Sequence, residues 1–534
     1  MRNIYFAVFT TIINVSIPVN DSSHRASPHK WAFRDNWTVK TTTGPVVGHA
    51  ETGVAAFRGI PYAEPPTGDL RFRRARPKEP WSTPLLATQS GSPCIQIRNA
   101  DHGVIGSENC LWLDVVVPRD PSSRSAVDPT ARRPVVVFFH GGSNAFGSAA
   151  KRLYSAQYLA TALDAVVVAV NYRIGVAGGL SLSYGTPQPD LPADRFDTNT
   201  QLSDAVMAVT WIRDNAEVFG GDPHRIIAMG QSSGGGLVAS LTAVPQLEKV
   251  IAGVIMLSPP LAMVHHPDLA ALWANRLFDR CDNPLTVDSR TIGALSGALL
   301  QENVKNVEFG GPFAPVIDGD LLPRHPLEIT PTAPGVGGKV PLLIGTVSHE
   351  YYFMRLRRVT TATQRHRAQR FAESIGPDAA DVFRQMYRNG QSRTECADLF
   401  GDCLFWAPSI ALAERWSPSN VWMYRLDAST PFFKALGLGA THTWDLPLLF
   451  GRYDSGIASK AFTIGGLDRI KATTAAMQRR WRDFIHDGAP GFTPYSDDRS
   501  THIFGDDGET TVNDPRHDMR EAWSSVDFAN VGSK

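Results

Sequence analysis

A serine between glycines stands where a predicted strand gives way to a predicted helix. Residues 226–229 form a short apolar run typical of a buried strand, and residues 237–241 are compatible with a helix. Between them the sequence has Gly-x-Ser-x-Gly spacing, with Ser232 at its centre and Ser233 next to it. A sharp strand-to-helix turn of this kind exposes the serine Oγ, and the helix N-terminus stabilises developing negative charge. We predict that Ser232 is a nucleophile; the alternative is a Gly/Ser-rich turn without chemistry.

A second glycine loop also follows an apolar run. Residues 135–139 have the continuous hydrophobic character of a central parallel strand and lead directly into His140, two glycines and Ser143. A strand that ends in this way leaves backbone N–H groups free at the carboxyl edge of the sheet, as an oxyanion hole requires. The alternative is another glycine turn. Two such loops, each after a strand, arise by accident less often than one.

A serine nucleophile needs an acid and a base later in the chain, in the order Ser, acid, His for this arrangement. Glu350 follows the predicted strand 342–345, and His442 lies in a loop among small residues. The glutamate side chain is long enough to reach a loop histidine, so we predict Glu350 as the acid and His442 as the base. The rival base is His349, and the rival acids are Asp318 and Asp320, which read as turn residues, and Asp445.

A sheet whose strands alternate with helices is needed to position these candidate residues. Apolar side chains recur at helical spacing between residues 199 and 220, which predicts a crossover helix, and residues 477–485 predict a C-terminal helix. The alternation indicates an α/β fold with a mostly parallel sheet covered on both faces. The interval 265–334 is helical and loop-rich and could roof a pocket. Residues 39–81 read as hairpins and a rigid loop. The predicted strands are 111–117, 135–139, 166–170, 226–229, 254–257, 342–345 and 421–425.

The composition is that of a folded protein without a strong electrostatic preference. The chain has 534 residues, of which 43% are hydrophobic and 19% charged, enough for a sizeable core. Lys and Arg total 52 and so do Asp and Glu, so no global field favours nucleic acid or an anionic membrane. No uninterrupted apolar run reaches the roughly 18 residues of a membrane span. We therefore expect no nucleic-acid partner and no stable membrane insertion.

The N-terminus resembles a secretory signal. Arg2 precedes an apolar stretch at residues 4–17, although Thr and Asn residues dilute it and no clear cleavage site follows. We predict a leader at residues 1–38, with a single domain at residues 39–534. The protein would then be exported or secreted; a disordered leader on a cytoplasmic protein is the alternative.

Five cysteines are present and none has the paired spacing of a zinc site. Their odd number leaves at least one thiol without a partner in the chain. Cys94 and Cys110 enclose a loop of about 15 residues, which a disulfide would stabilise by roughly 3 kcal/mol. Two free thiols are an equally good interpretation of the spacing. The remaining cysteines are Cys281, Cys396 and Cys403.

Over roughly residues 39–494 the chain resembles the type-B carboxylesterases, relatives of the cholinesterases within the α/β-hydrolase fold. The resemblance rests on many separate blocks, which together are highly specific. They are Phe-Arg-Gly-Ile-Pro-Tyr-Ala-x-Pro-Pro from 57, Ser-Glu-Asn-Cys-Leu from 107, His-Gly-Gly from 140, Asn-Tyr-Arg from 171, Phe-Gly-Gly-Asp-Pro from 219, Gly-x-Ser-x-Gly-Gly from 230, Pro-Val-Ile-Asp-Gly-Asp from 315, residues 345–350, and Gly-Ala-x-His from 439.

The resemblance implies a Ser-His-Glu triad of Ser232, His442 and Glu350. It also implies an oxyanion hole, formed by the backbone N–H groups of Gly142, Ser143 and Ser233. It further implies a disulfide between Cys94 and Cys110, buried ion pairs Arg58–Glu108 and Arg173–Asp204, and no metal or organic cofactor.

The chain departs from the family pattern around the expected site. The departures are Ser143 for the third glycine of the oxyanion loop, Asn144 for an aromatic residue, Ser233 for alanine, Tyr351 and Thr443 for the glycines after the acid and the base, and Pro259 for the glycine after Ser258. Cys281 matches one half of a family disulfide but has no partner cysteine at the matching position downstream. None of them removes a catalytic group. They do alter the pocket, so the substrate does not follow from the resemblance.

The implied activity is hydrolysis of small to medium uncharged carboxylic esters through an acyl-enzyme, by a monomer or weak homo-oligomer. A specialised lactonase or acyltransferase would use the same triad. A non-catalytic adhesion protein, as occurs among relatives of this family, is disfavoured by the complete Ser, His and Glu set.

Overall fold

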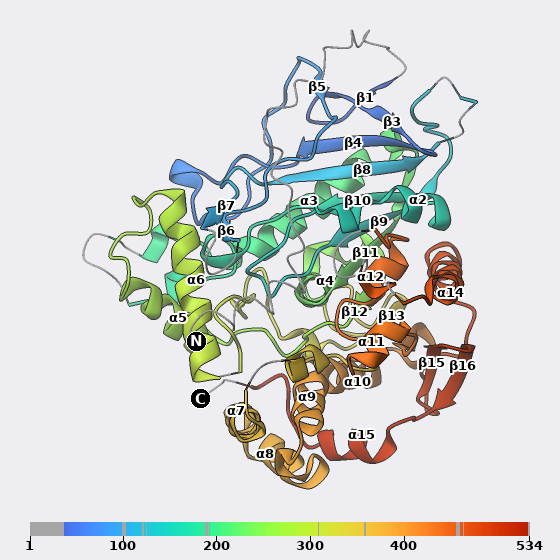
Figure 1. The fold of residues 1–534 in the computed structure, drawn as a ribbon. Coiled ribbons are helices and arrows are strands. Elements are labelled where there is room, and N and C mark those ends of the chain that lie inside the picture. The colour runs from blue at the N-terminus through green and yellow to red at the C-terminus, as the bar shows by residue number, and fades with distance from the viewer. Residues whose placement is uncertain are drawn as a thin grey trace.

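In the computed structural model an 11-stranded sheet runs through the centre of the molecule (Figure 1). The structure describes residues 37–531 except 99–102, 120–121, 124, 187–190, 192, 308, 357–358, 455–459 and 463. The strand order is β16-β15-β14-β13-β12-β11-β9-β10-β8-β4-β3, parallel from β15 to β10 and antiparallel at both edges. The strands are β3 (His49–Glu51), β4 (Val54–Pro61), β8 (Trp112–Pro118), β9 (Arg133–Phe139), β10 (Val166–Val170), β11 (Gly221–Gln231), β12 (Ile251–Leu257), β13 (Leu342–Val347), β14 (Val421–Leu426), β15 (Ser500–Gly505) and β16 (Gly508–Asn513).

The middle of the sheet consists of buried, β-branched runs. All five residues of β10 are buried, as a strand covered on both faces requires. Strand β9 lies between β10 and β11, and its last residue, Phe139, pairs with Gly230. This register places the glycine loop that follows β9 beside the turn that carries Ser232.

The predicted strands are confirmed, with boundaries shifted by a few residues. The structure adds β4, within the region interpreted as hairpins and a rigid loop, and the hairpin of β15 and β16, which was not predicted. Three charged or polar residues of β16 are exposed, and Gly508 opens the strand, so this edge hairpin carries little of the apolar alternation that marks a strand in sequence.

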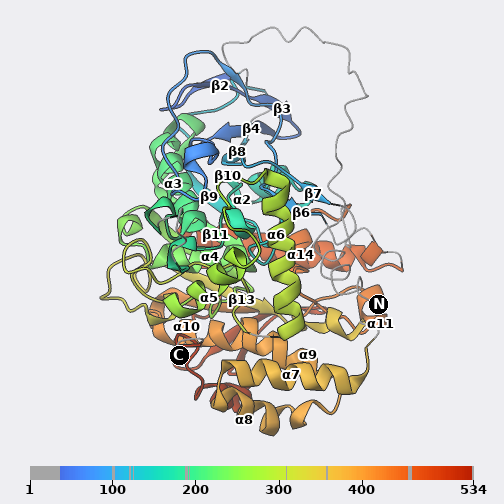
Figure 2. The ribbon, with the colours of Figure 1, turned by 90° about the vertical axis from the view of Figure 1, so that its left-hand side faces the viewer.

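Helices cover both faces of the sheet, as predicted. Helices α3 (Thr200–Asn215) and α4 (Ser233–Thr242) pack together against β11, and α2 (Gln157–Leu163) packs against α14 (Leu467–Asp487). Figure 2 shows α3 and α4 on one side of the strands and α14 on the other. Helix α3 is the predicted crossover helix. Helix α14 begins before the predicted range 477–485. The prediction missed its first turns because they are largely polar and lack the apolar pattern.

Two helical insertions leave the sheet at the ends of β12 and β13. The first contains α5 (Pro267–Phe278) and α6 (Ser289–Asn306), which confirms the helical character predicted for 265–334. The second contains α7 (Thr361–Ile375), α8 (Pro377–Met386), α9 (Arg393–Gly401) and α10 (Ala407–Arg415), and it was not predicted. Figure 2 shows α6 alongside the strands, with α7, α8 and α9 below its lower end.

One segment, Arg393–Arg415, is long and apolar enough to cross a membrane by length and composition alone. It comprises α9, α10 and the π-helical turn between them, and 83% of its most apolar window is buried inside the structure. Its apolar residues are thus accounted for by packing. The predicted leader, residues 1–38, lies almost wholly outside the described residues; β1 (Thr38–Lys40) already belongs to the fold.

The implied ion pair Arg58–Glu108 is wrong. Arg58 lies on β4, which pairs with β8, and this register places its guanidinium against Asp114 at 3.1 Å and Glu51 at 2.6 Å. Glu108 pairs instead with Arg71 at 2.7 Å. Strand pairing, which the chain order does not reveal, decides which carboxylate reaches Arg58.

The pair Arg173–Asp204 is confirmed and should contribute strongly to stability. The Arg173 guanidinium donates to both carboxylate oxygens, at 2.6 and 2.8 Å, and the side chains are only 2% and 0% exposed. Asp204→Ala would leave a buried cation unpaired, so the free energy of unfolding should fall by about 3–5 kcal/mol. Urea unfolding would measure it. The matched control is Glu217→Ala, which breaks an exposed pair with Arg132 and should cost at most about 1 kcal/mol. Equal losses would contradict the prediction.

Cys94 and Cys110 are free, buried thiols in the structure, so the disulfide implied by the resemblance is not formed there. The two side chains are nevertheless in hydrogen-bonding contact, and burial together with this contact raises the pKa of the Cys110 thiol well above its usual value. Formation of a disulfide between them would require oxidising surroundings, which depend on the compartment and not on the spacing of the two cysteines.

Candidate active site

Ser232 occupies a strained turn between β11 and α4. Its φ of 55° and ψ of −130° lie in a region that costs an L-residue on the order of 1–3 kcal/mol. Strand and helix approach so closely that side chains are excluded beside it. A Cβ on Gly230 would lie 2.3 Å from the Gly234 carbonyl oxygen, and a Cβ on Gly234 would lie 2.1 Å from that of Phe139. Close packing therefore requires the two flanking glycines, as their spacing predicts.

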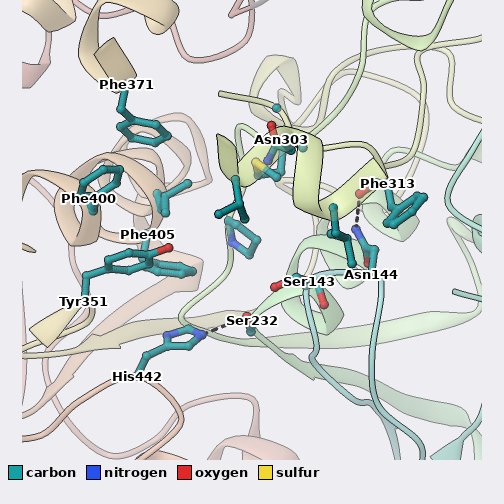
Figure 3. A pocket seen from close by; sticks show the side chains of 18 of the residues that line it. Ser143, Asn144, Ser232, Asn303, Phe313, Tyr351, Phe371, Phe400, Phe405 and His442 are labelled. Atoms are coloured by element: carbon teal, nitrogen blue, oxygen red, sulfur yellow. Dashed lines mark hydrogen bonds between the residues drawn. The ribbon is translucent and has the colours of Figure 1, made fainter. Parts of the chain in front are cut away.

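Three side chains from distant parts of the chain form a continuous hydrogen-bonded series at this turn. Ser232 Oγ lies 2.9 Å from His442 Nε2 (Figure 3), and His442 Nδ1 lies 2.6 Å from Glu350 Oε2. His442 and Glu350 are 7% and 5% exposed, so water competes little for these bonds. When Nδ1 carries the proton and donates to Glu350, Nε2 is free to accept a proton from Ser232. The series can therefore activate the serine hydroxyl.

Backbone and side-chain contacts hold Glu350 in one orientation. The His442 N–H donates to the Glu350 carbonyl at 3.3 Å, which brings the two residues together. The second carboxylate oxygen, Oε1, accepts from the Val347 N–H at 2.9 Å and from the Ser258 hydroxyl at 2.7 Å. Oε2 is left to face the imidazole.

Most of the rival residues lie outside this series. Asp318 and Asp320 both pair with Arg74, at 3.0 and 2.5 Å, and the Asp320 side chain is 73% exposed. The His349 ring contacts the Ser348 hydroxyl at 2.7 Å, and among the described residues it makes no hydrogen bond to Ser232. Of the two adjacent residues 349 and 350, it is the glutamate that faces His442.

Asp445 is the rival that comes closest to the series. It is fully buried at the start of α12 (Asp445–Leu449), and no other side chain in the described part of the molecule hydrogen-bonds to its carboxylate. Burial, together with the nearby charge of Glu350, raises the pKa of Asp445 to about 7. His442 Nδ1 already contacts Glu350, so Asp445 is not a member of the hydrogen-bonded series. It is a buried titratable group close to Glu350 and His442.

The loop after β9 is folded so that backbone N–H groups stay unused. The Phe146 N–H donates to the Gly142 carbonyl at 2.9 Å, and a Cβ on Gly142 would lie 1.8 Å from the Phe146 oxygen. Ser143 has a φ of 55°. Among the described residues, the N–H groups of Gly142 and Ser143 donate to no other group. Ser233 begins α4, where the first N–H groups have no helical partner.

Two buried amide side chains help to shape this region: Asn144 lies within the loop, and Gln231 lies at the end of β11. The Asn144 amide donates to the Phe313 carbonyl at 3.1 Å (Figure 3) and its Oδ1 accepts from Gln201 at 3.2 Å. Asn144 therefore anchors the loop. Gln231 Nε2 lies 3.4 Å from His442 Nε2, so a second donor faces the nitrogen that accepts from Ser232.

A largely apolar cavity of about 250 Å³, lined partly by aromatic rings, opens beside Ser232 and His442. Figure 3 shows Tyr351, Phe405, Phe400 and Phe371 along one side of it, and Ser143, Asn144 and Phe313 along the other. Phe405 stacks on the His442 ring at 4.4 Å, and Phe400 contacts both Tyr351 and Phe371. Arg367 is the one formally charged lining side chain in the described ranges, apart from the titratable His442. No group of three or more described His, Cys, Asp or Glu residues could hold a metal ion.

A family model described as "Carboxylesterase family" matches residues 35–514. The chain belongs to the carboxylesterase family. Its fold is the α/β-hydrolase arrangement of solved carboxylesterases. A thermophilic PNB esterase superimposes with a TM-score of 0.78 at 29% identity, over 91% of this chain and all of the other.

Curated carboxylesterase relatives match over nearly their whole length. Para-nitrobenzyl esterase of Bacillus subtilis (strain 168) is 30% identical over 90% of this chain and 97% of its own. Phenmedipham hydrolase of Pseudarthrobacter oxydans is 30% identical over 89% and 96%, and human cocaine esterase is 28% identical over 85% and 84%. The activities in these names differ, so membership of the family leaves the ester itself open.

Sequence reasoning missed several residues of this carboxylesterase site. The cavity side chains of α7 and α9, such as Phe371 and Phe400, belong to an insertion for which no strand or turn motif gave a signal. The contact of Gln231 with His442 was also missed, although Gln231 adjoins the predicted nucleophile. The position of Gln231 directly before Ser232, inside the Gly-x-Ser-x-Gly turn, was the sequence signal that pointed to this contact.

Proposed function

We propose that this carboxylesterase hydrolyses small to medium uncharged carboxylic esters through Ser232, His442 and Glu350. The supporting observation is the hydrogen-bonded series of these three side chains at one end of a largely apolar cavity. An apolar lining favours ester groups without charge, since an unpaired charge is costly to remove from water. Two relatives of this chain are named para-nitrobenzyl esterase and phenmedipham hydrolase, and both names denote hydrolysis, the reaction class that we propose here.

The reaction would proceed in two stages. In the first, His442 takes the Ser232 proton as Oγ attacks the ester carbonyl, and Glu350 stabilises the imidazolium. The N–H groups of Gly142, Ser143 and Ser233 would receive the developing oxyanion. Its collapse breaks the bond to the alcohol oxygen, which His442 protonates, and leaves an acyl-enzyme. In the second stage water takes the place of the alcohol and the acid is released.

Two measurements test this function against its alternatives. A fluorophosphonate should add covalently to Ser232, as judged by mass spectrometry, which a non-catalytic adhesion protein would not show. Product analysis of one ester with and without an added alcohol separates hydrolysis from acyl transfer: hydrolysis gives the free acid in both cases. Faster turnover of lactones than of open-chain esters would favour the lactonase alternative.

The proposed base predicts the pH dependence. His442 must be neutral to accept a proton, so kcat/KM should rise with pH as the imidazole loses its proton. A stopped-assay pH profile on one neutral ester measures the rise. It should be retained in His349→Ala, because His349 does not contact Ser232, and activity should collapse in His442→Ala.

Asp445 needs a separate control, because its carboxyl group, with a pKa of about 7, titrates near neutral pH and lies close to His442. Below that pH the Asp445 carboxyl is protonated and neutral; above it, the carboxylate adds a negative charge near His442. If His442 causes the rise, Asp445→Asn should keep the profile with at most a shifted midpoint. A flat profile in Asp445→Asn would reassign the titration to Asp445.

A further inference from the structure

On the far wall of the cavity, the face of helix α6 carries one polar side chain among apolar neighbours. Helix α6 presents Leu300, Asn303, Val304 and the following Val307 to the cavity, at the spacing of a single helical face. Figure 3 shows Asn303 across the cavity from Ser232 and His442. The amide of Asn303 is therefore a neutral polar group that a substrate can reach when its ester group lies at Ser232, whereas the nearby Arg367 is charged.

The Asn303 amide is not satisfied by the protein. Its Oδ1 is buried, and among the described residues it accepts no hydrogen bond. A buried, unpaired carbonyl oxygen loses the hydrogen bonds that water would supply. The terminal side-chain torsion of asparagine is broad and roughly two-fold, so the amide oxygen and nitrogen can exchange places. A donor brought in by a bound molecule would restore the missing bond.

A glycine keeps space open in front of this amide. A Cβ on Gly311 would lie 3.2 Å from Asn303 Nδ2. Two buried side chains fix the loop that carries this glycine: the His265 ring contacts the Gly311 carbonyl at 2.8 Å, and the Trp273 indole donates to the Gly310 carbonyl at 3.2 Å. Burial lowers the pKa of His265 to about 4, so its ring is neutral and the contact persists at neutral pH.

The neighbouring helix holds the wall in place. Arg367 of α7 donates to the Val304 carbonyl at 2.6 Å, one residue beyond Asn303. Because the loop on one side and α7 on the other fix the position of the asparagine, the amide is presented by a rigid surface. Rigid presentation favours recognition of one kind of group.

We propose that Asn303 is a specificity-determining residue, which binds a neutral hydroxyl or carboxamide at the end of the substrate away from the ester. This inference rests on the proposed ester hydrolysis and narrows its substrates to esters with a second, hydrogen-bonding group. A hydroxyl and a carboxamide both donate to Oδ1 and accept from Nδ2, so they fit either orientation of the amide. A carboxylate has no proton to donate and leaves Oδ1 unpaired.

The test compares matched nitrophenyl esters of straight-chain acids that end in methyl, hydroxyl, carboxamide or carboxylate, in a series of chain lengths. A parallel series of acetate esters carries the same end groups on the alcohol. Wild type, Asn303→Leu, Gly311→Ala and the control Asn306→Leu are assayed. Asn306 lies on the same helix but does not line the cavity. The readout is the ratio of kcat/KM for each polar ester to that for its methyl partner.

In wild type this ratio should reach a maximum at one chain length, and Asn303→Leu should lower that maximum about tenfold, the value of one hydrogen bond. Gly311→Ala should lower it too, without altering Asn303, whereas Asn306→Leu should leave it unchanged. A ratio in Asn303→Leu within about threefold of wild type at every chain length would overturn the proposal, as would a maximum for the carboxylate esters. Failure of wild type to hydrolyse any of these esters in a Ser232-dependent way would instead refute the proposed function.

Discussion

Ser232→Ala is expected to lower kcat for ester hydrolysis by about 10⁶-fold, the loss seen for other triad serines. The variant removes the Oγ atom that we propose as the nucleophile, and His442 loses the partner 2.9 Å from its Nε2. The fold should survive, because the methyl group of alanine fits wherever the serine Cβ fits. Turnover of a nitrophenyl ester and thermal unfolding measure the two effects separately.

Ser233→Ala is the matched control. It removes a neighbouring hydroxyl but keeps the backbone N–H that we assign to the oxyanion hole, so kcat should stay within about tenfold of wild type. Fluorophosphonate labelling should persist in Ser233→Ala and disappear in Ser232→Ala. Near-normal turnover in Ser232→Ala, with Ser233→Ala inactive, would show that the nucleophile has been misplaced.

Glu350→Gln should approach a loss of about 10⁴-fold in kcat, by analogy with triad aspartates. Glu350 Oε2 accepts a hydrogen bond from His442 Nδ1 at 2.6 Å, while Oε1 accepts hydrogen bonds from the Val347 N–H and the Ser258 hydroxyl. A glutamine fills the same space but must direct its NH₂ at one of these donors. If it donates to Nδ1, the proton of His442 moves to Nε2 and the ring can no longer accept from Ser232.

Two aspartate variants serve as controls for Glu350→Gln. Asp318→Asn should leave turnover nearly unchanged, because Asp318 is engaged by Arg74, Thr198 and Asn199 and does not contact His442. Asp445→Asn should alter turnover only modestly, because Asp445 makes no hydrogen bond to the imidazole among the described residues. Circular dichroism confirms that each variant is folded. Wild-type turnover in Glu350→Gln, together with collapse of a folded aspartate variant, would reassign the acid.

The central strands and the turn that carries Ser232 could be predicted from sequence because their signals are local. Burial on both faces makes a central strand such as Val166–Val170 uniformly apolar. Tight contact makes Gly230 and Gly234 obligatory around Ser232. In both cases neighbouring residues in the chain are also neighbours in space, so the spacing of residue types carries the physical constraint.

The acid and the base show where local information ends. Sequence order and strand position favoured Glu350 and His442, but His349 and Asp445 stand one and three residues from them. The choice depends on side-chain direction after β13 and on the backbone contact between Glu350 and His442, which join segments about 90 residues apart.

The sequence alone determined the central strands of the sheet, the order in which Ser232, Glu350 and His442 follow one another in the chain, and the glycines on either side of Ser232. Only the tertiary structure decided that Arg58 meets Asp114, and that α6, α7 and α9 bring Asn303, Phe371 and Phe400 to one cavity. Strand register and helix docking are set by packing between distant segments. Such packing depends on the summed shape and burial of many side chains, and no short stretch of sequence contains that sum.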